Sequence, residues 1–220
     1  MKKILLFIKD IGIILGFFII YSLLTVINLN LFKEGSFRYN IFDLFSVLLL
    51  CLILTLIYKN TIQKDFQDFK KNIKPYFKKY IKYYFISYLI MIVINLLLMY
   101  IVKDQATNQN LNEQSIVINP FFSFINMCII APYYEEILLR LNLRNLSNNR
   151  YVYVLISGLI FGSLHLLAAD SLIQLLYILP YSIMGMMLAL VYYDSNNIFA
   201  SIMIHAFNNL LSVILVLGGF

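Results

Sequence analysis

The chain has 220 residues, of which 61% are hydrophobic and only 13% are charged, and its mean hydropathy is +0.82. Such a composition provides too little polar surface to cover a soluble globule, so it excludes a soluble enzyme and indicates an integral membrane protein. The formal net charge is +6, but no nucleic-acid-binding motif, Walker loop or GxGxxG sequence accompanies it, so neither a nucleic acid nor a nucleotide is expected as a partner.

Long apolar stretches occupy most of the chain. A helix needs roughly 20 residues to cross the hydrocarbon core of a bilayer, and these stretches lack the alternating pattern of barrel strands. We therefore predict an all-α fold, a polytopic transmembrane bundle of about seven helices. The predicted spans are approximately 11–29, 41–58, 83–102, 118–142, 151–169, 172–193 and 198–217.

Basic residues between the spans predict the orientation, because short loops rich in Lys and Arg stay in the cytoplasm. One side of the membrane receives Lys2, Lys3, the segment 59–82 with its eight lysines, Arg144 and Arg150. The other side receives only Lys33, Arg38 and Lys103. We expect a multi-pass protein of the cell membrane with a cytoplasmic N-terminus and an external C-terminus.

Two connecting segments have distinctive compositions. The 59–82 segment alternates apolar residues with lysines at roughly helical spacing, which fits a helix lying on an anionic leaflet and bent at Pro75. It also fits a basic loop that only fixes the topology. The Asn- and Gln-rich segment 103–116 is expected to be a flexible external connector. Cys51 and Cys128 lie in apolar stretches without a CxxC pair, so we interpret them as packing residues.

Ionisable residues in the later apolar stretches are the candidates for function, because a charge at the centre of a membrane helix costs about 2.5–3.5 kcal/mol. Glu136 and Arg140 are four residues apart and can pair on one helix face, whereas Glu135 points about 100° away. A carboxylate left free in this way suits a general base. The same three residues could instead form a salt network at the lipid headgroups.

The only two histidines of the chain, His165 and His205, lie in the predicted fifth and seventh helices. His205 and Asn209 are one turn apart and share a face. A single histidine in a membrane helix usually makes interhelical hydrogen bonds. Two histidines, a glutamate and an asparagine, however, supply a base for water, an imidazole to position it and donors for an oxyanion, which is sufficient for hydrolysis.

Three motifs carry a family resemblance: Glu135-Glu136-x-x-x-Arg140, Phe161-x-x-x-His165 and His205-x-x-x-Asn209. In this order on successive helices they resemble the motifs of the CPBP family, which comprises CAAX proteases and bacteriocin-processing enzymes and is also called the Abi family. The resemblance covers Pro132 to Asn209, whereas the first three helices resemble no known family. Leu139 and Leu141 depart from the family, which commonly has an aromatic residue and a glycine there.

The resemblance implies an intramembrane endopeptidase with a four-helix catalytic core in residues 118–217, preceded by N-terminal transmembrane helices in residues 1–117. It implies that Glu135 activates water with His165, while His205 and Asn209 stabilise the oxyanion. The supporting residues would be Glu136, Arg140 and Phe161. The implied substrates are prenylated CAAX proteins, bacteriocin leaders, peptide pheromone precursors and related peptide or membrane-protein substrates.

A zinc ion held by Glu135, His165 and His205 is the alternative to metal-free catalysis. No HExxH sequence places two histidines on one helix, which favours the metal-free glutamate mechanism. His205 lies roughly 10 Å along its helix from the cytoplasmic start, so the site is expected in the cytoplasmic half of the bilayer and reached by water from inside. The fifth helix would then have to tilt or begin below the surface.

Two other classes of function use the same residues differently. A non-proteolytic membrane protein, such as an immunity or sensor-regulating protein, could keep the polar cluster for packing or partner binding. A small transporter is disfavoured because the chain lacks matching broken helices in two halves.

Overall fold

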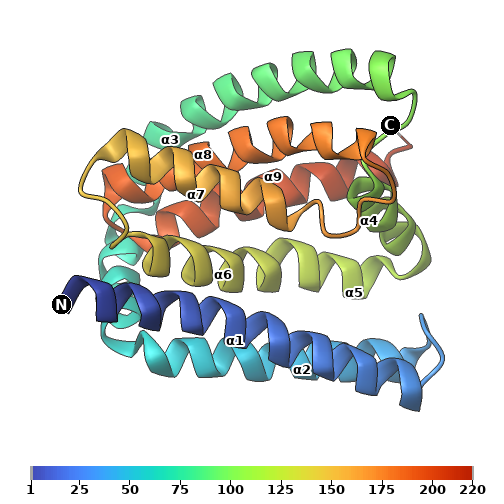
Figure 1. Ribbon diagram of the computed structural model, residues 1–220, viewed down its shortest axis with the longest axis horizontal. Coiled ribbons are helices and arrows are strands. Elements are labelled where there is room, and N and C mark those ends of the chain that lie inside the picture. The colour runs from blue at the N-terminus through green and yellow to red at the C-terminus, as the bar shows by residue number, and fades with distance from the viewer. Residues whose placement is uncertain (1, 220) are drawn as a thin grey trace.

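The computed structural model describes residues 2–219, apart from the side chains of residues 2–4 and 7. Within that range every regular element is helical, and the long helices run side by side as a bundle (Figure 1). The α-helices are α1 (Lys2–Leu31), α2 (Phe37–Ile57), α3 (Lys59–Val102), α4 (Thr107–Ile118), α5 (Pro120–Ile125), α6 (Ala131–Glu136), α7 (Arg150–Leu164), α8 (Ile178–Ser195) and α9 (Ile198–Leu217). Two π-helical turns, η1 (Asn126–Ile130) and η2 (Ile137–Leu141), and a 3₁₀ turn, η3 (Ile173–Tyr177), complete the set. The predicted all-α bundle is confirmed.

Six helical segments of the described chain are long and apolar enough to cross a membrane, and α7 is a shorter apolar helix. These seven correspond to the seven predicted spans, and α9 has the predicted bounds. Large apolar side chains on α1, α2 and the later part of α3 are exposed, as lipid-facing side chains are, so the chain is a multi-pass membrane protein. The predicted fifth span, 151–169, is too long, because α7 ends at Leu164 and His165 caps it.

The segment 59–82 is the first part of α3 and is helical. The helix is kinked at Asn72, where φ is −120° and ψ is 16°, three residues before Pro75. Proline lacks an N–H and crowds the preceding turn, so a kink close to Pro75 has a clear cause. Before the kink α3 crosses the end of the bundle at which α1 begins, and after it α3 runs the length of the bundle (Figure 1). We call this end, with residues 59–82 and 142–149, the lysine end.

Hydrogen bonds fasten the first part of α3 to the start of α9 at the lysine end. The backbone N–H of Ile198 donates to Asp65 Oδ2 over 3.0 Å, and Asn197 Nδ2 lies 2.8 Å from both the Asp65 carbonyl oxygen and Asp68 Oδ2. The side-chain oxygen of Asn197, Oδ1, accepts from the N–H of Phe199, which caps α9. The position of the helix that carries His205 is therefore tied to the basic segment.

The opposite end of the bundle holds α4, residues 32–36 and residues 165–172, and we call it the α4 end (Figure 1). The prediction of a flexible connector over 103–116 is wrong, because most of this segment forms α4. Gln174 ties it down: its Nε2 donates to the Gln105 carbonyl oxygen over 3.1 Å, and its Oε1 accepts from the N–H of Thr107 over 3.3 Å. The composition of residues 103–116 could not predict these contacts, because Gln174 is far away in the sequence.

Helices α7 and α8 pack with their backbones in close contact. A Cβ atom added at Gly158 would lie 2.8 Å from the Ser182 carbonyl oxygen, and one added at Gly185 would lie 2.7 Å from Phe161 Cβ. Such separations exclude any side chain at these two positions. Small residues spaced in this way let membrane helices approach closely, and here they fix Phe161 and the end of α7 against α8.

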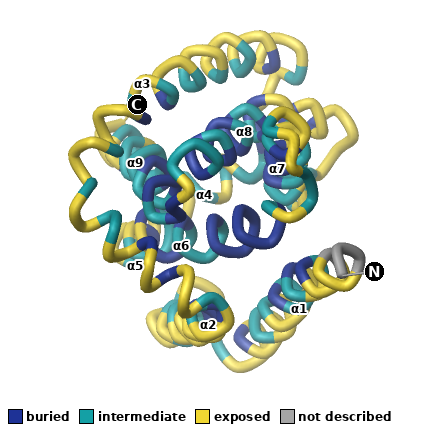
Figure 2. Tube along the Cα trace, turned by 90° about the vertical axis from the view of Figure 1, so that its left-hand side faces the viewer, coloured by how far each residue is buried: buried dark blue, intermediate teal, exposed yellow. Residues whose placement is uncertain are grey.

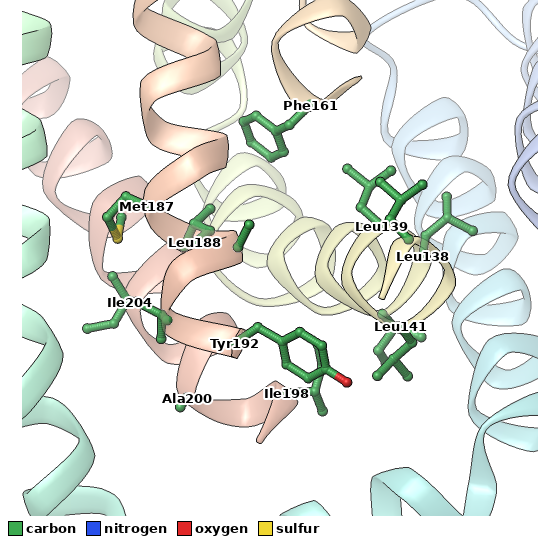
Figure 3. Packing of buried hydrophobic residues seen from close by; sticks show 14 of the residues in the cluster. Leu138, Leu139, Leu141, Phe161, Met187, Leu188, Tyr192, Ile198, Ala200 and Ile204 are labelled. Atoms are coloured by element: carbon green, nitrogen blue, oxygen red, sulfur yellow. The ribbon is translucent and has the colours of Figure 1, made fainter. Parts of the chain in front are cut away.

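The core lies between α6, α7, α8 and α9, whereas α1 and α2 form a hairpin at the edge with many exposed residues (Figure 2). In this core Met187, Leu188 and Tyr192 of α8 lie beside apolar residues of α9, and the leucines of η2 lie across from them (Figure 3). The two ionisable motifs on α6 and α9 are thus held by a packed apolar shell.

Candidate active site

Glu135 and Glu136 lie in α6, between the two π-helical turns η1 and η2. A π turn adds a residue to one turn of a helix and is frequent at functional sites, because it rotates the following side chains relative to a regular α-helix. The carboxylates of Glu135 and Glu136 therefore lie in a long helical segment whose π turns change the directions of the side chains.

Glu136 and Arg140 form the predicted ion pair, and both are fully buried. Arg140 Nε donates to Glu136 Oε2 over 2.8 Å and Arg140 Nη2 donates to Oε1 over 3.1 Å, which is a bidentate pair. Arg140 Nη1 donates to Ser157 Oγ over 2.6 Å, and the guanidinium lies 5.3 Å from the Phe161 ring centre. The guanidinium of Arg140 is thus held by partners on α6 and α7.

His205 joins the same group from α9. Its Nδ1 lies 3.1 Å from Glu136 Oε1, and Ser201 Oγ, one turn earlier, donates to Glu136 Oε2. An ionised carboxylate only accepts hydrogen bonds, so Nδ1 carries the proton and Nε2 is the atom left to face the cavity. Glu136 therefore orients His205, as a carboxylate does for the histidine of a catalytic triad.

Glu135 is the carboxylate without a strong partner. Its Oε2 lies 3.9 Å from His205 Nε2, too far for a direct hydrogen bond, and within the described chain this buried oxygen has no hydrogen-bond partner. Its side chain is 23% exposed and lines a cavity. A buried acceptor without a donor is costly, so it marks a place where water or a ligand is expected.

His165 lies at the C-terminal cap of α7. Its Nδ1 lies 2.9 Å from the Phe161 carbonyl oxygen, which can only accept, so Nδ1 carries a proton and Nε2 has a free lone pair. The imidazole ring lies 4.3 Å from the Phe161 ring and 4.8 Å from that of Tyr181, centre to centre. Two aromatic side chains thus hold His165.

Asn209 lies one turn after His205. Its Nδ2 donates to the Met127 carbonyl oxygen of η1 over 2.8 Å, which leaves its second N–H available. Asn208, which does not share the helix face of His205 and Asn209, belongs to the same group: its Nδ2 donates to Asn209 Oδ1 over 3.0 Å, and Asn208 also lines the cavity.

One cavity of about 660 Å³ collects Glu135, His165, His205 and Asn209, together with Phe161. Its size is typical of a ligand site. Motif reasoning missed Tyr181 beside His165, and Ser157 and Ser201 beneath the charged group. For Ser201 the spacing of four residues before His205 was an available signal, whereas nothing in the local sequence marks Tyr181.

The cavity extends toward the α4 end. It is lined by residues of α4, such as Asn108 and Asn112, and by the late part of α9 as far as Val216. Among the described residues its lining includes none from 59–82 or 142–149. The predicted entry of water from the lysine end is therefore not found.

The three candidate metal ligands are Glu135, His165 and His205. Each histidine uses Nδ1 in a hydrogen bond and keeps Nε2 free, as a metal-ligating histidine does, and Glu136 is engaged by Arg140. Among the described residues, however, no group of three or more His, Cys, Asp or Glu side chains is arranged to hold a metal ion. As placed, Glu135, His165 and His205 do not form a three-ligand site.

Comparison with protein families gives a match over the part of the chain that contains Glu135, His165 and His205. A family model described as type II CAAX prenyl endopeptidase Rce1-like matches residues 117–211. This match confirms the resemblance to the CAAX protease family and supports a membrane endopeptidase of the CAAX-protease type in general. It covers less than half of the chain and leaves α1, α2 and α3 outside. No curated protein and no solved structure matches the chain.

Proposed function

We propose that the protein is an intramembrane endopeptidase that hydrolyses a peptide bond with Glu135 as general base. The observation that carries this proposal is the unpartnered Oε2 of Glu135 in a cavity shared with His165, His205 and Asn209. A structural salt network would satisfy its carboxylates, as Glu136 is satisfied, and would leave no buried carboxylate oxygen without a donor on a residue that lines a cavity. The same contrast argues against a packing role for Glu135.

In the proposed reaction a water molecule donates a hydrogen bond to Glu135 and another to His165 Nε2. Glu135 takes a proton as the water oxygen bonds to the carbonyl carbon of the peptide, and the carbonyl oxygen becomes an oxyanion. His205 Nε2–H and the second N–H of Asn209 donate to that oxyanion. When the intermediate collapses, the C–N bond breaks and the proton passes from Glu135 to the departing amine.

The charges of the group balance in this scheme. His205 donates to Glu136 through Nδ1 and to the oxyanion through Nε2, so it is cationic while it acts. Arg140 and His205 then oppose Glu136 and Glu135, and the four charges cancel. A neutral total is what a low-dielectric interior tolerates, because unpaired charges there are strongly destabilised.

We further propose that residues 118–217 form the catalytic core, that the lysine end faces the cytoplasm and that the protein resides in the cell membrane. The positive-inside rule supports this orientation. The substrate class within the proposal is a peptide precursor or a membrane-associated protein.

The deciding experiment compares Glu135→Gln with wild type on candidate precursor peptides after reconstitution in liposomes. The exchange preserves the shape of the side chain but removes the base, so the turnover rate should fall by about 10²–10⁴-fold. Asp170→Asn, in an exposed loop at the α4 end, is the matched control and should keep full activity. Cleavage by Glu135→Gln at the wild-type rate would rule out Glu135 as the base, and absence of cleavage by the wild type would support a non-proteolytic immunity or sensor-regulating role instead. A chelator arm tests the zinc alternative.

A further inference from the structure

A second cavity adjoins the one that holds Glu135. It has a volume of about 810 Å³ and lies between the α1–α2 hairpin and the α4–α5 region. The two cavities share Tyr21, Asn112, Asn126 and Met127 as walls. The two cavities are therefore neighbours on opposite faces of α4, and in the proposal below we call them together the path from the candidate active site toward the α4 end.

The walls of this path are rich in amide groups. Asn95, Asn108, Gln109, Asn112, Asn126 and Asn208 line the first cavity, and Asn40, Gln114 and Asn119 line the second. Amide side chains both donate and accept hydrogen bonds, as the backbone of an extended peptide requires. Apolar walls alone would suit a lipid chain, whereas these walls suit a polypeptide backbone.

The charged groups on the path are mostly acidic. Glu113 and Glu135 line the first cavity, and Glu34 and Asp43 line the second; among the described lining residues Lys33 is the only Lys or Arg. Glu113 accepts from Gln105 Nε2 and Gln109 Nε2, both at 2.9 Å, so its neighbours are neutral and its charge is not cancelled. Because the charge of Glu135 is balanced within its own group, a carboxylate on the ligand would meet repulsion in the first cavity from Glu113.

We propose that the substrate is an extended, cationic peptide segment that enters from the α4 end and is cut at an internal bond. This inference rests on the proposed function for the cleavage step, but it concerns binding and can be measured without turnover. Lysine or arginine side chains of the peptide would lie opposite Asp43 and Glu113, and its backbone would pair with the amides of α4 and α5.

Charge preference is tested by binding of three fluorescent peptides that differ only in their flanking residues: lysine, serine or glutamate. The protein is Glu135→Gln in liposomes, so cleavage does not interfere. Affinity should fall in the order lysine, serine, glutamate. Adding Asp43→Asn or Glu113→Gln should weaken binding of the lysine peptide about three- to five-fold each at low salt, and leave the serine peptide unchanged.

Asp170→Asn, an acidic position at the same end but outside both cavities, is the matched control and should bind all three peptides like its parent. Equal affinity for the three peptides, or an equal loss in all variants, would overturn the charge preference. Charge-dependent binding without cleavage by the wild type would remove the proposed function and leave this inference standing. Cleavage by the wild type without charge-dependent binding would support the proposed function and overturn this inference.

The direction of entry is tested with introduced cysteines and a bulky maleimide. Asn112→Cys lies in the wall shared by the two cavities, and Lys71→Cys lies exposed at the lysine end. Labelling of Asn112→Cys should abolish binding of the lysine peptide, whereas labelling of Lys71→Cys should leave it intact. The native Cys51 and Cys128 are buried, and wild type treated with the maleimide controls for them. The opposite pattern would place the entrance at the lysine end and overturn the proposal.

Discussion

Helices α1 to α3 and the segment from α5 to α9 are both strongly apolar, yet they bury their residues to different extents. Only 6% of the residues in the apolar window of α3 are buried, compared with 56% in the η3–α8 window. The first region buries carboxylates near the lysine end, at Asp10 and Asp65, whereas the second buries Glu136 and Arg140 within a helical span. A long apolar run thus indicates a membrane span. A pair of opposite charges inside such a run indicates, in addition, which half of the protein contains the candidate site.

The largest effect should come from breaking the buried pair. Glu136→Gln leaves the Arg140 guanidinium buried without its counter-charge and should lower the free energy of unfolding by about 3–5 kcal/mol. Glu135→Gln is the matched control, because it has no bidentate partner and should change stability by less than about 1 kcal/mol. Thermal unfolding in detergent measures both. If Glu136→Gln and Glu135→Gln lowered the free energy of unfolding equally, the Glu136–Arg140 ion pair would not be what stabilises the core.

The stability cost of removing one leucine side chain can be compared directly between the two regions. Leu188 on α8 is fully buried in the protein core, whereas Leu52 on α2 is 54% exposed. Leu188→Ala should cost about 2–4 kcal/mol because it opens a cavity. Leu52→Ala should cost little, because lipid tails are as apolar as leucine and fill the space. Similar losses in the two variants would show that α2 also packs against protein.

A smaller difference in stability should distinguish a residue that only caps a helix from one that also bonds to α3. Asn197→Ala removes the cap of α9 and the bonds to Asp65 and Asp68, and should cost about 2 kcal/mol. Asn149→Ala removes the cap of α7, whose side-chain oxygen accepts from Tyr151 and Val152, and should cost about 1 kcal/mol. If both variants lose the same amount, the bonds to α3 contribute nothing measurable.

Most of the spans could be predicted from the sequence because long apolar runs mark them, whereas the fifth was predicted too long. The bounds of α9 agree with the structure, and the spacing of Glu136 and Arg140 predicted their ion pair. The helix α4 escaped prediction because its residues are mostly polar. Its order comes from Gln174, whose contacts with the chain around Gln105 bridge a long separation in sequence.

Glu135, His165, His205 and Asn209 line one cavity, and the roles given to them from the sequence stay a prediction; their connections were predicted only in part. Helical spacing could not reveal that His205 is bonded to Glu136, because the two lie on different helices. It also could not reveal the π turns around α6, which have no sequence signature comparable to a cap or a proline. The direction of the cavity was missed for the same reason, since it depends on where α4 folds back.

The contact of Gly158 with Gly185 bears on how the protein could admit a polypeptide. An added Cβ at Gly185 would lie 3.0 Å from Gly158 Cα, so no side-chain rotamer is present there that could yield. Helices α7 and α8 must then behave as one stiff wall that carries His165 and Tyr181. Any widening needed for a substrate therefore falls to the facing wall, which α1 and α4 provide.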